Sequence, residues 1–386
     1  MALGLNLVGA GLGQALTARG LALYLAVIVP GEPSLPIALL AVIIATGLAM
    51  LNIRANAKVT GAFLGLELMA LAAMALLGFF HPHQPLAQIV LHPTVLAGNA
   101  LKPASWRVIG LGTASAIFAY NGYGNAVSLG EELHQARSRI AAVVIISLLV
   151  AVVVEFTPVI AVLIGMKDPA RVFAAAAPMP AFIAEASGPT FAKAISLGVA
   201  MAIFNALIAG ALINARQLYA TGRDQVWPAL VSRAIERTHA RFRSPWVATA
   251  IAGGISAAAC FLKLETLIVL TANGVVVLYF GVCLAAIIGR LRGSTARGAY
   301  RMPLFPLTPV LAIIALCGVV WVDLQDLAVG LPSLVASLGV MLLFAAYYRF
   351  WLRSRSRWAL RGPDGDLAAH PRARAAEQGN PIGPSL

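Results

Sequence analysis

The chain has 386 residues, of which 60% are hydrophobic and only 11% charged, and its formal net charge is +13. Soluble domains carry about 25% charged residues, and disordered chains combine low hydrophobicity with high charge, so the composition excludes both classes. We therefore expect an all-α membrane protein whose chain divides into spans of about 20 residues.

Ten apolar runs follow one another along the chain, and we expect each to form a membrane-spanning helix because lipid offers no partners to backbone N–H and C=O groups. The runs cover residues 2–29, 34–53, 57–80, 108–130, 140–165, 191–215, 246–262, 266–289, 305–322 and 329–350. Residues 1–350 would then form one transmembrane domain. Residues 351–386 are basic and rich in Pro and Gly, which predicts a disordered cytoplasmic tail.

The basic residues fall mainly in the connectors of one side. If the chain crosses at every run, that side receives most of the 28 Lys and Arg residues, including those between Arg216 and Arg243 and those from Arg349 to Arg374. Cytoplasmic loops collect Lys and Arg, so we expect a multi-pass protein of the cytoplasmic (plasma) membrane with both termini inside. Topology thus accounts for the charge without nucleic acid. The tail either contacts anionic membrane lipid or serves only to stop transfer.

Two acidic residues interrupt apolar runs. Glu67 lies midway in 57–80, where a charge is costly and marks a candidate functional site. It is either a proton-linked group or a side chain hydrogen-bonded to a neighbouring helix. Glu155 precedes Pro158 in 140–165. Because proline bends a helix and frees a carbonyl group, Glu155 serves either structure or a proton path.

The connector after residue 80 contains His81, His83 and His92 among prolines. His-x-His can bind a metal, but no cysteine or carboxylate cluster accompanies these side chains. The three cysteines of the chain lie in apolar runs without metal-ligand spacing. We expect no metal and no cofactor, and no nucleophile and base are arranged in a pattern that indicates an enzyme.

Glycine and asparagine gather in the middle of the run 108–130, in the segment Phe118-Ala-Tyr-Asn-Gly-Tyr-Gly-Asn125. Glycine costs about 1 kcal/mol in a helix interior and Asn competes for backbone hydrogen bonds, so we expect a broken helix. Transporters use the backbone groups exposed at such breaks to hold small polar solutes; the alternative is close helix packing through small residues. The residues predicted to line a substrate site are Tyr120, Asn121, Gly122, Tyr123 and Gly124.

Other polar residues have two interpretations each. Glu131, Glu132 and Arg137 form either an inner gate that makes and breaks ion pairs or a solvated helix end, where such pairs contribute ~0–1 kcal/mol. Asn205, deep in the run 191–215, either faces the substrate pathway or bonds a neighbouring helix.

Several of these segments resemble the amino acid–polyamine–organocation (APC) superfamily of permeases. The stretch from Phe118 to Arg139 resembles its sixth helix and the loop that follows. Asn205-Ala and Asn214-Ala-Arg-Gln-Leu-Tyr-Ala-Thr-Gly-Arg-Asp-Gln-Val-Trp-Pro228 resemble its eighth helix and the loop after it. Leu51-Asn-Ile-Arg-Ala-Asn-Ala-Lys58 is similar to its fourth-to-fifth connection, and Gly4-Leu-Asn-Leu-Val-Gly9 to the start of its third helix.

The resemblance implies a bundle of two inverted repeats of five helices. Residues 2–80 would form a partial first repeat, 108–290 a complete second repeat and 305–350 two peripheral helices. The family's first two helices would be absent.

The resemblance also implies secondary active transport of an amino acid or related amine by alternating access, with proton coupling or exchange. Free N–H groups of a half-helix favour the substrate carboxylate, and Tyr120 or Tyr123 suits the ammonium group through cation–π contact. Glu67 and Glu155 are the proton-coupling candidates. The alternative is a non-transporting permease remnant or a membrane scaffold.

Overall fold

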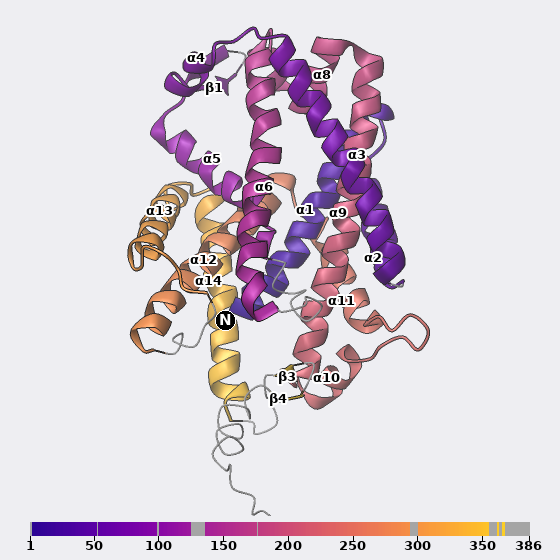
Figure 1. Cartoon of the computed structure of the whole chain (residues 1–386), viewed down its shortest axis with the longest axis vertical. Helices are drawn as coiled ribbons and strands as arrows, with labels where there is room; N and C mark the ends of the chain where they lie inside the picture. Colours follow the sequence, from indigo (N-terminus) through magenta and orange to yellow (C-terminus); the bar gives the residue numbers. More distant parts are fainter. Residues whose placement is uncertain are drawn as a thin grey trace, which may run out of the picture.

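Helices make up nearly all of the regular structure in the computed structural model of this chain (Figure 1). The structure describes residues 2–51, 53–98, 100–124, 136–175, 177–293, 300–354, 361–362 and 365–366. Its longer helices are α1 (Ala2–Ile28), α2 (Ser34–Ala49), α3 (Ile53–Phe80), α5 (Trp106–Ala119), α6 (Ala136–Gly165), α9 (Pro189–Arg223), α11 (Trp246–Ala259), α12 (Leu264–Leu291), α13 (Leu307–Asp323) and α14 (Gly330–Ala346). Helix α14 continues as a π-helical turn over Tyr347–Leu352.

Within the described residues, six helices are long and apolar enough to cross a membrane, and they lie in α1, α3, α6, α9, α12 and α14 with its π-helical turn. Helices α2, α11 and α13 are apolar but shorter. The protein is therefore a mostly helical membrane protein. Each of the predicted apolar runs overlaps a helix, although the number of crossings stays a prediction.

The helix boundaries differ from the apolar runs at several places. The second run was expected to reach residue 53, but α2 ends at Ala49 and α3 begins at Ile53. The sixth run was expected to end at residue 215, whereas α9 continues to Arg223. The extension follows from sequence, because Arg, Gln, Leu and Ala are good helix formers that apolarity alone does not identify.

Small side chains form the centre of the bundle. Ala15 and Ala18 of α1 are fully buried and pack with α2, α9 and α11 in one apolar cluster. Met74, Val162 and Phe182 form a second cluster that joins α3, α6 and α8 and includes residues of α9. Lipid tails are as apolar as these side chains, so close backbone approach and van der Waals contact, rather than exclusion of water, hold such helices together.

The contact between α3 and α6 depends on glycine. A Cβ atom at Gly78 would fall on the backbone of Ala161, and one at Gly165 would come within 2.7 Å of the Cα atom of Gly78. The two helices thus approach to backbone contact at this point, which a larger residue at either position would prevent.

The connectors contain short elements that the apolar pattern did not reveal. Between α3 and α5 lie α4 (Leu86–Leu91) and an antiparallel hairpin of β1 (Thr94–Ala97) and β2 (Ala100–Pro103), in which Thr94 pairs with Pro103. Helices α7 (Pro169–Ala174) and α8 (Pro178–Ser187) precede α9, and α10 (Ala229–Ile235) follows it. In Figure 1, α4 and β1 lie at one end of the bundle and α10 at the other.

The histidines of the connector after α3 contact backbone. The Nδ1 atom of His83 lies 3.1 Å from the carbonyl oxygen of Gly165, and its backbone N–H donates to the carbonyl of Ile164. Among the described residues, no group of three or more His, Cys, Asp or Glu side chains is placed to hold a metal ion.

Candidate functional site

A polar cavity of about 190 Å³ lies between α1, α9 and α12 and is bordered by Asn121, just after α5. Its lining combines small residues with uncharged polar side chains. The polar ones are Asn6, Gln14, Thr17, Asn121, Asn214, Gln217 and Thr271. No charged residue occurs among the described residues that line it, so the cavity suits a polar solute without net charge.

Each of the three helices presents one face to the cavity. On α1 the lining residues are 5, 6, 9, 10, 13, 14 and 17, and on α9 they are 206, 210, 214 and 217. Spacings of three and four residues place side chains on one face of an α-helix. The cavity is therefore the meeting point of small and polar helix faces, between helices that α1 contacts directly.

Two amide side chains join α1 to α9 beside the cavity. Gln14 is buried and donates from Nε2 to the carbonyl oxygen of Leu207, at 3.1 Å. Asn214 donates from Nδ2 to the carbonyl oxygen of Ala10, at 3.3 Å. These bonds fix both amides and set the width of this side of the cavity.

The hydroxyl groups in the lining bond within their own helices. Thr17 donates to the carbonyl oxygen of Gly13, at 2.8 Å, and Thr271 to that of Leu267, at 2.6 Å. Because a hydroxyl has one donor and two acceptor positions, both oxygens keep acceptor capacity. The lining thus offers acceptors suited to an ammonium group as well as amides that can donate.

Glycine makes room at the site in two ways. A Cβ atom at Gly210 of α9 would collide with the side-chain amide of Gln14, so glycine permits the bond from Gln14 to Leu207. At Gly9 and Gly274, which also line the cavity, no neighbour lies within 4 Å of an added Cβ atom. The first glycine serves packing, and the other two leave space.

The segment predicted to break its helix does end a helix. Helix α5 stops at Ala119 and residues 120–122 form a turn, with a φ angle of +132° at Gly122. That angle lies in a region which glycine adopts without steric cost. The Oδ1 atom of Asn121 accepts a hydrogen bond from the hydroxyl of Tyr279 at 3.1 Å, which ties the turn to α12.

The structure separates the predicted site residues. Asn121 lines the polar cavity. Tyr120, Gly122, Tyr123 and Gly124 are its neighbours in the chain but do not line it, although the ring of Tyr123 lies 6.3 Å from that of Tyr279.

Asn205 is buried in α9 and also lies outside the lining. Of the predicted gate, Glu131 and Glu132 lie outside the described residues. Arg137 is in the first turn of α6, and its side chain is likewise outside the description.

The two acidic candidates lie away from the polar cavity. Glu67 is on α3 and Glu155 on α6, and these helices pack along each other. The carboxyl groups are close enough to interact electrostatically. Neither side chain contributes to the cavity lining.

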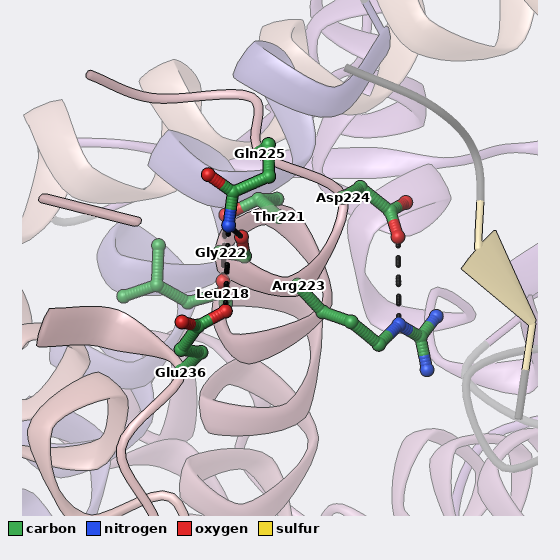
Figure 2. A network of polar contacts seen from close by, with 7 residues as sticks. All are labelled: Leu218, Thr221, Gly222, Arg223, Asp224, Gln225 and Glu236. Carbon is green, nitrogen blue, oxygen red and sulfur yellow. Dashed lines mark hydrogen bonds and ion pairs between the residues drawn. The ribbon is translucent and has the colours of Figure 1, made fainter. Parts of the chain in front are cut away.

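A polar network surrounds the C-terminal end of α9 (Figure 2). Thr221 donates to the carbonyl oxygen of Leu218. The same hydroxyl accepts from the indole Nε1 of Trp227 at 2.7 Å. Gln225, which has a positive φ angle, donates to the carbonyl oxygen of Gly222 at 3.2 Å and to Glu236 at 3.4 Å.

The same segment is further fixed by packing and charge. A Cβ atom at Gly222 would come within 3.1 Å of Ile235 and Ser232. Arg223 and Asp224 form an ion pair with 3.4 Å between Nε and Oδ1. The loop after α9 is therefore folded against α10 as a defined unit.

Sequence reasoning missed most of the cavity lining. Asn6, Gln14, Thr17 and Thr271 are single polar residues in apolar runs and were not predicted as site residues. The available signal was the helical spacing from Asn6 through Thr17, which places small and polar residues on one face of α1.

The sequence matches the model of a known protein family. The model of a family described as amino acid permease matches residues 2–345. This range includes every residue that lines the polar cavity.

Proposed function

We propose that this chain, which belongs to the amino acid permease family of the APC superfamily, carries an amino acid through the polar cavity between α1, α9 and α12. The family implies amino acid transport, so the protein is a transporter rather than an enzyme. The observation that carries the proposal is the uncharged polar lining of a cavity that lies between helices long and apolar enough to span a membrane.

The cavity matches the chemistry of a zwitterion. Amides such as Gln14 and Asn214 offer dipoles, and the threonine hydroxyls keep acceptor capacity for an ammonium group. An unpaired charge in the lining would be costly to bury and would select a charged solute instead. At ~30 Å³ per water, a volume of about 190 Å³ corresponds to roughly six waters, which is room for a small amino acid.

In this proposal the turn after α5 contributes one of the substrate contacts. Asn121 is the residue of this segment that reaches the cavity, and Tyr279 holds its amide oxygen. In our proposal the end of α5 moves with the turn during alternating access, and the bond from Tyr279 positions Asn121 when the cavity is closed around the substrate. The conformation of the turn then depends on its other residues, Tyr120, Gly122, Tyr123 and Gly124.

Coupling is assigned to the acidic pair. The charges of Glu67 on α3 and Glu155 on α6 interact, and protonation of one carboxyl group would relieve the repulsion between two carboxylates. In this scheme, proton uptake at the pair changes the packing of α3, which also contacts α9. Glu67→Gln is expected to abolish uptake driven by a proton gradient and to spare exchange of internal for external amino acid. Intact proton-driven uptake in this variant would overturn the coupling role.

We place the protein in the plasma membrane with both termini inside, in ten crossings arranged as two inverted repeats of five with two peripheral helices. The support is the distribution of arginine. Arginines lie at or just after the end of α9 (Arg223, Arg233 and Arg237) and at the end of α12 (Arg290 and Arg292), as the positive-inside rule requires. Labelling of single cysteines introduced into the connector after α9, from outside intact cells, is expected to fail. Labelling at these positions would show that the orientation is opposite to the one proposed.

Binding of a labelled amino acid mixture to the purified protein tests the site. Gly9→Leu directs a large side chain into the cavity without a clash at its Cβ atom, since no neighbour lies within 4 Å. Gly47→Leu is the matched control, because Gly47 on α2 also has no neighbour within 4 Å and lies outside the lining. We expect Gly9→Leu to lose binding and Gly47→Leu to retain it. Equal binding by the two variants would place the site elsewhere.

A further inference from the structure

A second cavity, of about 370 Å³, lies where α12 ends and the chain leads into α13. Its lining residues are Ala286, Arg290, Gly293, Tyr300, Arg301, Met302 and Phe305. None of them lines the polar cavity between α1, α9 and α12.

This second cavity is positively charged. Arg290 and Arg301 both line it, and none of its described lining residues is acidic. Within the part of the chain that the structure describes, neither arginine has an acidic group at ion-pair distance. Two guanidinium groups at one cavity without a carboxylate favour an anion as the occupant.

Arg290 is held in place by its surroundings. Its Nη1 donates to the carbonyl oxygen of Met302 at 3.1 Å, and its Cζ lies 4.5 Å from the centre of the Phe305 ring. A guanidinium has five N–H donors in a planar fork, so one bond to Met302 leaves most donors available. The fork geometry fits the oxygens of a phosphate group, and Tyr300 adds a hydroxyl to the same lining.

Exposed apolar side chains continue from the cavity along both helices. Ile288 and Leu291 on α12 are 46% and 76% exposed, and Leu304 and Leu307 at the start of α13 are 75% and 53% exposed. Helix α12 is long and apolar enough to span a membrane, and exposed apolar side chains on such a helix suit contact with acyl chains. A free phosphate ion would make no use of these apolar side chains. A phospholipid would contact the arginines with its headgroup and the apolar side chains with its acyl chains.

We propose that the cavity at Arg290 and Arg301 binds the phosphate headgroup of an anionic phospholipid, with the acyl chains lying along the exposed apolar side chains of α12 and α13. Basic pockets between membrane helices on the cytoplasmic side bind such headgroups. The choice of the inner leaflet rests on the orientation given under the proposed function, but binding itself does not.

Native mass spectrometry of the purified full chain tests this site, titrated separately with phosphatidylglycerol, phosphatidylcholine and inorganic phosphate. The main variant combines Arg290→Gln with Arg301→Gln. The control combines Arg233→Gln with Arg237→Gln, which removes the same charge from exposed arginines in and just after α10. Because Arg290 also bonds Met302, Arg301→Gln alone is the second variant; among the described residues, the Arg301 side chain makes no hydrogen bond or ion pair that this substitution would remove.

We expect phosphatidylglycerol to bind the unaltered protein at least tenfold more tightly than phosphatidylcholine. The double variant should lose at least tenfold in affinity for phosphatidylglycerol, Arg301→Gln at least threefold, and the control less than twofold. Equal losses in the main variant and the control would overturn the site, as would equal affinity for both lipids. Inorganic phosphate that binds as tightly as phosphatidylglycerol would overturn the lipid assignment. Since the readout is lipid binding, none of these outcomes depends on amino acid transport.

Discussion

The contact of α1 with α9 gives the sharpest test of the site geometry, through Gly210→Ala. The new Cβ atom would collide with the side-chain amide of Gln14, which must then swing away and break its bond to the carbonyl oxygen of Leu207. Gln14 is only 8% exposed, so loss of this buried bond costs about 1–3 kcal/mol. Alanine itself favours a helix over glycine by about 1 kcal/mol, so we expect net destabilisation of about 0–2 kcal/mol.

Gly9→Ala is the matched comparison. Gly9 lines the same cavity on α1, and no neighbour lies within 4 Å of an added Cβ atom. This variant keeps the gain of about 1 kcal/mol in helix propensity without a clash. In reversible unfolding in detergent micelles, we expect the free energies of unfolding of the two variants to differ by about 1–3 kcal/mol, with Gly210→Ala the less stable. Equal stability of the two would refute the close approach of Gln14 to α9, and with it the width assigned to the cavity.

Three further substitutions test the contacts around the site. Thr221→Val removes the acceptor of the Trp227 indole and should lower the free energy of unfolding in detergent by about 1–2 kcal/mol; an unchanged unfolding midpoint would contradict that bond. Gly78→Leu forces a side chain onto the backbone of α6 at Ala161. Overpacking of this kind should lower the free energy of unfolding by about 1–3 kcal/mol or more. An unfolding curve like that of the unaltered protein would argue against this contact. Tyr279→Phe frees the Asn121 amide oxygen and should weaken amino acid binding about fivefold, equivalent to ~1 kcal/mol; equilibrium binding that stays unchanged would remove Tyr279 from the site.

The fold class could be predicted from sequence because it depends on bulk properties. Apolar runs of sufficient length require helices in lipid, and each predicted run overlaps a helix of the structure. The end of α5 at Ala119 was also predictable, since Asn121 and Gly122 follow it directly and both disfavour a helix. These are local effects, which composition and spacing reveal.

The cavity could not be predicted in the same way, because it forms where three helices meet. Thr271 of α12 lies in the lining with Gln14 of α1, yet nothing in either run indicates that the two face each other. Asn205 and Asn214 are equally polar and lie on the same helix. Only Asn214 lines the cavity, because the rotation of α9 against α1 is set by packing around Gly210.

The short elements between α3 and α5 were missed for another reason. Residues 81–105 are rich in proline, and this pattern predicts a connector without regular secondary structure. The hairpin of β1 with β2 and the bonds from His83 and Gln84 to Ile164 at the end of α6 depend on tertiary contacts. Such contacts override the weak local preferences of a proline-rich segment.

Uptake of labelled amino acids by proteoliposomes tests the central claim most directly, with the unaltered chain, Gly9→Leu and Gly47→Leu measured in parallel. The account predicts time-dependent accumulation by the unaltered chain and by Gly47→Leu, and its loss in Gly9→Leu, whose new side chain fills the polar cavity. Binding without uptake in the unaltered chain would contradict transport and favour a non-transporting permease. Uptake by Gly9→Leu equal to that of the control would show that the substrate does not pass through this cavity.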